Sequence, residues 1–364
     1  MYSIPLDPNL RAHSEQMQIS LRSVKLVASA TGSLVLRYYS LARYLWISES
    51  LQENTDIVQD HKSSIVATIH SFLEHISYAT PTVACSRRRQ LVSALDSTLL
   101  SCGVSTRGVP SFRYHERVCE HAAAMSELSF HDHDFETQVQ IAKFTWFMIY
   151  IDDLSSRMPS ALEDFQSKLF SRELPNDPVL QLLTEHLSDM YRFWDPLPAN
   201  CITGATLEFV TGCALEINAE IQRIEPSSSP SSWPYYLRAK TGVAPAYAFM
   251  IFKTISGSMS RYMQVIADIC LFIDLTNDVL SFYKEELAGE TVNYIHNRAA
   301  VVGKLPIDVV SEVASEALAA YDRVTAALQP TFQSDDAIRA WKTFVNGYVA
   351  FHMTQDRYQL KELF

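Results

Sequence analysis

The segment "SMSRYMQVIADICLFIDLTNDVLSFYKEELA", residues 258–288, contains neither Gly nor Pro and is far too long to be a β-strand. The same is true of residues 111–158. Because Gly and Pro are the residues that most strongly interrupt helices, each segment predicts one or two buried helices. The whole chain has 10 Gly in 364 residues, well below an average usage of about 7%. Long apolar segments with so little Gly indicate an all-α fold.

Other parts of the chain agree with this fold class. In "SSIVATIHSFLEHI" (63–76), four apolar residues recur at helical spacing: Ile65, Ile69, Phe72 and Ile76. The segment 308–328 repeats the pattern after Pro306, which suits the first turn of a helix. Residues 330–364 predict a last helix, and "FWDPLPANCITG" (193–204) and "IEPSSSPSSWP" (224–234) predict loops. We therefore expect a single α-helical domain over residues 1–364, in which residues 1–60 carry no recognisable motif.

Composition and charge limit the partners. The net charge of -11 argues against nucleic-acid or anionic-membrane binding through bulk electrostatics, although it permits a local basic pocket. The six Cys, at positions 85, 102, 119, 201, 213 and 270, form no CxxC pair and suit reduced, mostly buried thiols. There is no signal-peptide pattern and no apolar run of the roughly 18 residues that a membrane span needs. These features predict a soluble, cytoplasmic protein.

The opening segment also carries a ladder of oxygen-bearing side chains. In "NDVLSFYKE", Asn277, Ser281 and Glu285 are four residues apart, so on a helix they share one face at steps of about 6 Å. Amide, hydroxyl and carboxylate oxygens suit Mg²⁺, whereas Cys or His would indicate zinc. A solvated helix face with this spacing arises by chance about once in such a chain. The stricter string, with Asp278 and Lys284, is far rarer.

A second acidic motif follows an apolar run. In "FTWFMIYIDDLSSRM", eight largely apolar residues lead directly into Asp152 and Asp153. Acids at the C-terminus of a helix are opposed by its dipole, so a cation is expected nearby, unless the two are ordinary surface acids. Met148, Thr145 and Phe144 lie one and two turns before Asp152. The arrangement predicts an apolar cavity with metal ligands at its mouth, which suits an apolar substrate with an anionic head group.

Basic residues supply a third signal. "YYLRAKTGVA" places Arg238 and Lys240 just before Gly242, where a helix could break, and "DRYQL" adds Arg357 and Tyr358 near the C-terminus. Arg matches the two oxygens of a phosphate group with its planar fork, and Tyr can donate one more hydrogen bond. Each residue alone is unremarkable at a protein surface. Together they favour a diphosphate site.

One segment suggests a rival metal site. "HDHD", His131 to Asp134, could ligate a metal in a helical phosphohydrolase, but the chain offers no convincing further set of His and Asp ligands. An N-cap, formed by Asp132 or Asp134 for a helix that starts at Phe135, is the other interpretation.

With these motifs in hand, the chain resembles class I terpene cyclases, most closely the fungal trichodiene synthase family, over about residues 110–360. The string from Asn277 to Glu285 matches that family's metal triad and the Glu that ends it. Asp152-Asp153 matches the start of its aspartate-rich motif, and Arg357-Tyr358 its C-terminal pair. Arg238 matches the diphosphate-sensing Arg, with Thr241 and Gly242 at the linker and effector places.

The resemblance implies an α-helical bundle around a deep apolar cavity and Mg²⁺-dependent cyclisation of farnesyl diphosphate to a sesquiterpene. It implies three Mg²⁺ ions, for which Mn²⁺ can substitute, on the metal ligands Asp152, Asn277, Ser281 and Glu285. The diphosphate would be held by Arg238, Lys284, Arg357 and Tyr358, and the catalytic set would be Arg238, Thr241, Gly242 and Asp153. The cavity would include Phe144, Thr145 and Met148. Aromatic candidates for cation stabilisation are Phe144, Trp146, Tyr150 and Phe351, although aromatic residues at this spacing also form plain core.

One departure from the family pattern concerns Asp153. The aspartate-rich motif usually continues with a third acid, but here Leu154 and two Ser follow. Consecutive helical residues point about 100° apart, so we assign Asp152 to the metal. By resemblance, we expect Asp153 to pair with Arg357 or else to be solvated.

Three other functions remain open. A chain-elongating isoprenyl diphosphate synthase shares the fold but normally carries a second aspartate-rich motif where this chain has Asn, Ser and Glu. A helical metal phosphohydrolase would use the HDHD segment, and a non-catalytic helical protein would have no reason to align three motifs. We expect an isoprenyl diphosphate substrate, with no nucleic acid and no membrane span, and a homodimer would match related cyclases. The product skeleton is not encoded in any motif, and substrates of ten or twenty carbons remain open.

Overall fold

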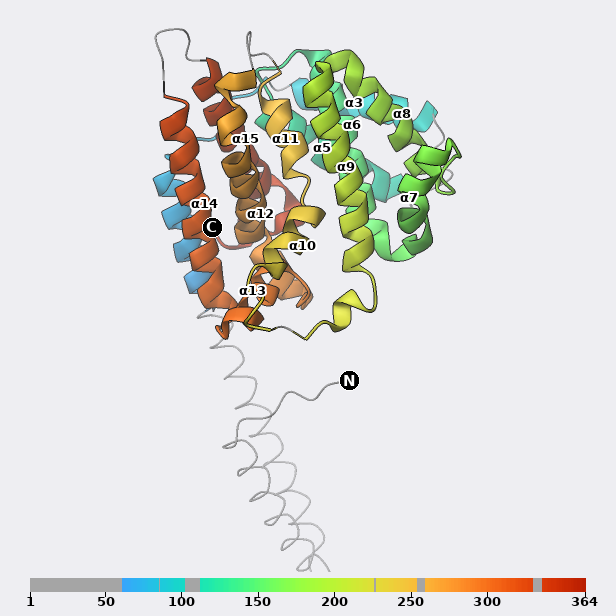
Figure 1. Cartoon of the computed structure of the whole chain (residues 1–364). Coiled ribbons are helices and arrows are strands. Elements are labelled where there is room, and N and C mark those ends of the chain that lie inside the picture. Colours follow the sequence, from blue (N-terminus) through green and yellow to red (C-terminus); the bar gives the residue numbers. More distant parts are fainter. Residues whose placement is uncertain (1–60, 85, 102–111, 226, 254–258, 330–335) are drawn as a thin grey trace, which may run out of the picture. The chain divides into compact units, whose positions relative to one another are not determined.

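The computed structural model describes residues 61–84, 86–101, 112–225, 227–253, 259–329 and 336–364 (Figure 1). These residues are helical or in turns, with no strand among them, so the predicted all-α fold is confirmed for the described chain. The chain divides into two compact units, residues 1–61 and 62–364. The prediction for residues 1–60 lies outside the described residues, and the single domain stays a prediction. The helices from α3 onward all belong to the second unit.

This unit begins with a helical segment, residues 62–75. The helices after it are α3 (Arg87–Ser101), α5 (Phe112–Ser129), α6 (Phe135–Leu154), α7 (Pro159–Ser171), α8 (Pro178–Phe193), α9 (Pro196–Glu216), α10 (Trp233–Thr241), α11 (Ala244–Ile251), α12 (Ile266–Ala288), α13 (Tyr294–Val302), α14 (Pro306–Ala327) and α15 (Asp336–Thr354). Short 3₁₀ turns precede α12 and follow α15, the latter at Asp356–Tyr358 and Leu360–Glu362.

Helix α12 lies within the bundle and packs against α14, α11 and α15. Helix α5 packs against α6, α3 and α15, while α9 packs against α10, α11 and α7 (Figure 1). One continuous hydrophobic core joins these helices. The two motif-bearing helices, α6 and α12, are therefore held by different neighbours, and both line one cavity.

Most predicted helices are confirmed. Residues 111–158 contain α5 and α6, and residues 258–288 contain α12. The four apolar residues of the segment 63–76 are all buried. Pro306 is the first residue of α14, where its missing N–H costs nothing. In the described chain, Cys119, Cys201, Cys213 and Cys270 are free thiols, two buried and two half-buried. No described helix is long and apolar enough to cross a membrane.

The predicted loop at residues 193–204 is wrong. Helix α8 ends at Phe193, and α9 begins only three residues later, at Pro196. Pro196 and Pro198 both lie in the first turn of α9, where backbone N–H groups have no partner within the helix, so proline does not interrupt it. The Pro-rich composition marked the start of a helix and was mistaken for a connection.

The HDHD segment forms the turn that starts α6. Asp134 is the N-cap, and its carboxylate accepts hydrogen bonds from the Thr137 backbone N–H and hydroxyl, each at 2.8 Å. The neighbouring Lys253 ammonium lies 3.3 Å from the same carboxylate. Although partial burial opposes ionisation, the Thr137 and Lys253 hydrogen bonds lower the pKa of Asp134 to about 2. The capping interpretation of this motif is confirmed.

Replacing the cap should loosen α6. Asp134→Ala leaves the first backbone N–H groups of the helix unpaired, so we expect it to lower the free energy of unfolding by about 1 kcal/mol. Because the folded pKa lies below that of an unfolded Asp, this stabilisation is present above about pH 4 and disappears as the pH falls toward about 2. Denaturant unfolding of both proteins across that range measures it.

Asp134→Ser is the matched control, since its hydroxyl can still accept from the Thr137 N–H. Its unfolding free energy should stay close to that of the parent at neutral pH. A loss in the Ser variant as large as in the Ala variant would contradict the capping role and point to the Lys253 contact.

Candidate active site

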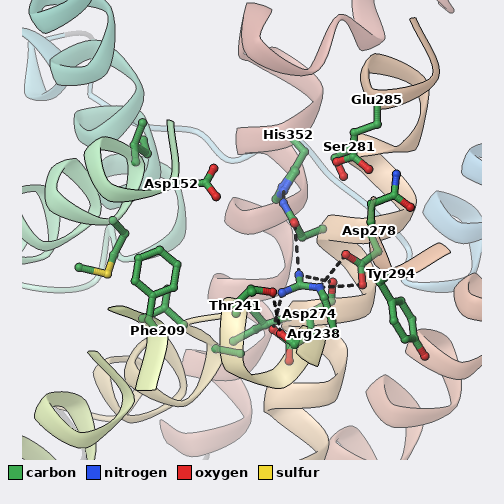
Figure 2. Close-up of a pocket in the computed structure, with 18 of the residues that line it drawn as sticks. Asp152, Phe209, Arg238, Thr241, Asp274, Asp278, Ser281, Glu285, Tyr294 and His352 are labelled. Carbon is green, nitrogen blue, oxygen red and sulfur yellow. Dashed lines mark hydrogen bonds and ion pairs between the residues drawn. The ribbon is translucent and has the colours of Figure 1, made fainter. Parts of the chain in front are cut away.

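A cavity of about 330 Å³ opens between α6, α9, α10, α12, α15 and the C-terminal turn. Figure 2 shows Asp152 facing it from one side and Ser281 and Glu285 from the other. The cavity contains nearly all of the motif residues that the sequence singled out: Thr145, Met148, Asp152, Arg238, Thr241, Gly242, Asn277, Ser281, Lys284, Glu285, Arg357 and Tyr358. Segments more than 200 residues apart in the chain therefore converge on one site.

The α12 ladder presents three hard oxygen donors to this cavity. Asn277, Ser281 and Glu285 all line it, as their four-residue spacing predicts. The Ser281 hydroxyl is buried and has no hydrogen-bond partner among the described residues. Since Ser281 also lines the cavity, its hydroxyl is available to a ligand there. An amide oxygen, a free hydroxyl and a carboxylate fit Mg²⁺.

The two acids at the end of α6 both pair with Arg357. Its guanidinium lies 3.1 Å from the Asp152 carboxylate and 2.9 Å from that of Asp153. The predicted pairing of Asp153 with Arg357 is therefore confirmed, and Asp152 shares the same cation. The Tyr114 hydroxyl also donates to Asp153 at 3.2 Å. Asp153 does not line the cavity, whereas Asp152 does, as their angular separation on the helix requires.

Arg238 lies in the last turn of α10 and bridges to α12. Its Nε donates to both oxygens of Asp278, at 2.7 and 2.9 Å, and its Nη1 lies 3.4 Å from Asp274. Its Nη2 donates to the Asn277 side-chain oxygen at 3.2 Å and to the Asp274 backbone carbonyl at 3.0 Å (Figure 2). Burial alone would lower the pKa of Arg238, but the Asp278 and Asp274 carboxylates raise it well above its usual value.

Two of these partners had no role in the sequence analysis. Asp278 appeared there only as part of the stricter string, and Asp274 was not considered. Both are buried and lie one turn apart on α12. A signal was available, because two acids four residues apart inside an otherwise apolar helix call for a buried cation. The sequence alone does not show which basic residue pairs with these two acids.

Gly242 ends α10 as predicted, and α11 starts two residues later. A Cβ at this position would overlap the Asp274 carboxylate and the Arg238 guanidinium, so a larger residue would displace this ion pair. Thr241 lines the cavity and donates to the Arg238 carbonyl at 3.3 Å. Lys240, the other basic residue of this motif, instead pairs with Glu208 at 2.8 Å and does not line the cavity.

The apolar wall differs from the expectation at Phe144. Thr145, Met148, Ile149 and Asp152 form the stripe of α6 that lines the cavity, at helical spacing. Phe144 lies about 100° away from Thr145 and is buried in the core, where its ring packs against Tyr247 and His186.

The other aromatic candidates also divide between wall and core. Trp146 and Tyr150 stack on each other in the core, with ring centroids 5.4 Å apart, and neither lines the cavity. Phe351 does line it, together with four aromatic residues that the sequence analysis did not single out: Phe209, Tyr247, Tyr294 and Tyr348.

Of the further polar residues of the cavity that the sequence analysis missed, one lies on α9 and one on α15. Glu216, at the end of α9, lines it, and burial with a contribution from Asp152 raises the pKa of Glu216 to about 7. His352, on α15, is fully buried behind Asn277, and burial lowers the pKa of its imidazole to about 3. Neither residue belongs to a spaced motif, because each comes alone from its own helix.

The rival HDHD segment does not form a metal site. Its side chains have separate partners: His131 contacts the Leu128 carbonyl, Asp132 accepts from Thr343, His133 contacts the Met250 carbonyl and Asp134 caps α6. Within the described ranges, the cluster of His, Cys and acidic side chains close enough to share an ion is Asp96, His115 and Cys119, which does not include this segment.

Comparison with known proteins agrees with this geometry. The profile of the trichodiene synthase (TRI5) family matches residues 115–364. Terpene synthase BipA of Cochliobolus sativus is 32% identical over 290 residues, which cover 79% of this chain and 87% of that protein. Alpha-cuprenene synthase COP6 of Coprinopsis cinerea is 32% identical over 234 residues, covering 64% and 69% of the two chains.

Solved structures share the fold at low sequence identity. The linalool/nerolidol synthase of Streptomyces clavuligerus has a TM-score of 0.60 at 11% identity and covers 76% of this chain and 99% of its own. Hedycaryol synthase in complex with nerolidol has a TM-score of 0.53 at 15% identity, covering 76% and 97%. With its helical bundle and converging motifs, the chain belongs to the trichodiene synthase family and is a class I terpene cyclase that acts on an isoprenyl diphosphate.

Proposed function

We propose that this cyclase is a Mg²⁺-dependent sesquiterpene synthase that converts farnesyl diphosphate into a sesquiterpene hydrocarbon or alcohol and releases diphosphate. One observation carries the proposal. A single cavity joins an apolar wall, on α6, α9 and α11, to a rim of carboxylates, hydroxyls and cations on α12 and the C-terminal turn. An isoprenyl diphosphate has the same division between an apolar chain and an anionic head.

The metal ligands in this proposal are Asn277, Ser281 and Glu285 on α12 and Asp152 on α6. Glu216 faces the same cavity as Asp152 and adds a carboxylate to that side. When bound, Mg²⁺ or Mn²⁺ would neutralise the leaving diphosphate as a Lewis acid. The free Ser281 hydroxyl supports the assignment, since it lacks the partner that a buried polar group requires.

The diphosphate ligands are Arg238, Lys284, Arg357 and Tyr358. Lys284 has one close carboxylate, Glu285 at 3.6 Å, which leaves much of its ammonium available to an anion. The Arg357 guanidinium faces Asp152 and Asp153 and lies at the rim, where it can turn toward substrate oxygens. Arg guanidiniums bind two phosphate oxygens at once, so these residues hold the head group in one orientation.

The wall residues hold the hydrocarbon chain and exclude water from it. Met148, Ile149, Phe209 and Phe351 present apolar or aromatic surface. Aromatic faces attract a carbocation through their negative π-face, and a dry cavity prevents its capture by water. Tyr247 and Thr145 add two hydroxyls 2.9 Å apart in this wall, which could hold a water where the product is an alcohol.

The proposal is tested by incubation with farnesyl, geranyl and geranylgeranyl diphosphate in the presence of Mg²⁺, followed by gas chromatography–mass spectrometry of the organic layer. The fifteen-carbon substrate should give the main cyclic product. Related proteins include an (E)-beta farnesene synthase and a monoterpene synthase, so the three substrates must be compared directly. In a parallel incubation with isopentenyl diphosphate added, a longer isoprenyl diphosphate in the aqueous layer would instead support the chain-elongating alternative. Release of phosphate alone would support hydrolysis.

The α12 ladder should set the metal requirement. Removing Mg²⁺ should abolish turnover, and Asn277→Ala or Glu285→Gln should lower it at least about 100-fold, since each removes an oxygen ligand or its charge from the same site. Steady-state kinetics at increasing Mg²⁺ give the comparison. Full turnover of both variants at saturating Mg²⁺ would reject this ladder as the metal site.

Arg238 should report diphosphate binding. In the parent protein, inorganic diphosphate with Mg²⁺ should raise the melting temperature, because a ligand that binds only the folded state stabilises it. In Arg238→Ala that rise should be largely lost, although the variant also starts from a lower melting temperature, since Asp274 and Asp278 lose their cation. A rise as large as in the parent would mean that Arg238 only supports the fold.

The shared cation at the end of α6 gives a third prediction. Asp153→Asn should reduce activity less than Asp152→Asn, yet change the product mixture by loosening Arg357 and admitting water. Arg357→Lys should behave similarly, because Lys cannot bridge two carboxylates with a planar fork. Product profiles and rates of Asp153→Asn, Arg357→Lys and the variant with both changes test this pairing. Fully additive losses in that double variant would show that Asp153 and Arg357 act independently.

A further inference from the structure

His352 lies behind the first oxygen of the α12 ladder. It is on α15, is fully buried and lines the cavity (Figure 2). Its imidazole contacts the Asn277 side chain. Tyr348 and Tyr358 hold the imidazole, with ring centroids 4.6 and 4.3 Å from it. A histidine packed this closely has one orientation, so the direction of each ring nitrogen is determined by its surroundings.

The hydrogen bonds of His352 fix its tautomer. Its Nδ1 lies 2.8 Å from the Tyr348 backbone carbonyl, which can only accept, so Nδ1 carries the proton. Its Nε2 lies 3.1 Å from the Asn277 side-chain nitrogen, which can only donate. The neutral imidazole with its proton on Nδ1 satisfies both contacts. His352 therefore accepts a hydrogen bond from the Asn277 amide.

The opposite side of the Asn277 amide gives the same orientation. Arg238 Nη2, a donor, lies 3.2 Å from the Asn277 oxygen. Turning the amide by 180° would place its NH₂ group against the guanidinium donors and its oxygen against the imidazole lone pair. Both contacts would then be repulsive. Two independent neighbours, from α10 and α15, thus require the arrangement in which the amide nitrogen faces His352.

We propose that His352 is a positioning residue that holds the nitrogen of the Asn277 amide, so that the oxygen stays on the side of Arg238 and the cavity, where a metal can bind it. The proposal rests on the function proposed above, in which Asn277 is a metal ligand. An Asn side chain has two broad, nearly equivalent amide orientations, and only one of them offers oxygen to a cation. A fixed acceptor behind the nitrogen removes the other orientation before the ion binds.

Metal affinity without turnover tests the inference. Mn²⁺ binding in the presence of inorganic diphosphate is followed by the electron paramagnetic resonance signal of free Mn²⁺. His352→Phe keeps a ring of similar size but has no acceptor, and we expect its affinity for Mn²⁺ to fall about 10-fold or more, as when other residues behind metal ligands are lost. His352→Gln restores an acceptor oxygen and should stay within about threefold of the parent.

Two controls separate positioning from general damage to the core. His186 is equally buried, packs against Phe144 and Phe147 and does not line the cavity. His186→Phe should leave Mn²⁺ affinity unchanged. In the Asn277→Ala background, His352→Phe should cause no further loss, because the residue acts through that amide. An equal loss in both backgrounds, or a Gln variant as weak as the Phe variant, would overturn the proposal.

A measurement on the parent protein keeps the inference testable if His352→Phe does not fold. Long-range ¹H–¹⁵N spectra of histidine-labelled protein distinguish the two neutral tautomers, and His352→Gln identifies the signal. The proton should be on Nδ1, with and without Mg²⁺ and diphosphate. A proton on Nε2 would overturn the proposal, since that nitrogen could not then accept from Asn277.

If the proposed function itself failed, the parent would neither bind Mn²⁺ with diphosphate nor turn over any isoprenyl diphosphate. A functional parent with an unaffected His352→Phe variant would reject the positioning role alone.

Discussion

The site depends on one interaction, the pairing of the buried Arg238 guanidinium with two carboxylates of α12. A charge in the interior is tolerated only where it is paired, because an isolated buried ion costs several kcal/mol. Asp278, Asp274 and Asn277 provide the partners, all on α12. The last turn of α10 must therefore lie against that helix. A Cβ just after α10 would overlap this ion pair, and Gly242 has none. Arg238 also contacts the Asn277 amide oxygen, while His352 contacts the amide nitrogen.

The same face of α12 thus has two kinds of polar group. Toward Arg238, Asp274 and Asp278 are paired with a cation inside the protein. One turn further along, the Ser281 hydroxyl is buried without a partner in the described chain. Folded proteins satisfy most buried polar groups, and the exceptions tend to lie where a ligand binds. Asn277 lies between these two groups. Its amide nitrogen donates to His352, and its oxygen accepts from Arg238.

On the α6 side of the cavity, a second set of ion pairs holds the structure together. Helix α6 ends in two acids, which its own dipole disfavours. Arg357 supplies the opposing charge from a 3₁₀ turn near the end of the chain. This ion pair attaches the C-terminal turn, with Tyr358, to the rim that faces α12. An anion that bound Arg357 would compete with both carboxylates for the same guanidinium.

The spacing of residues along single helices determined much of this protein. From it came the helical fold, the α12 ladder, the α6 stripe through Thr145, Met148 and Asp152, and the cap at Asp134. These are local properties, because the helical repeat fixes which residues of one segment share a face. The family resemblance added the pairing of Asp153 with Arg357.

Other features depended on how the helices pack. Three features follow from how each helix is rotated against its neighbours. They are the placement of Phe144 in the core, the partners of Arg238, and the position of Glu216 and His352 in the cavity. The loop predicted at residues 193–204 failed for a local reason, since proline in a first turn resembles proline in a connection. Sequence spacing shows which side chains share a face, but only the packed bundle decides what that face meets, because each helix is oriented by apolar burial and charge pairing with segments far away in the chain.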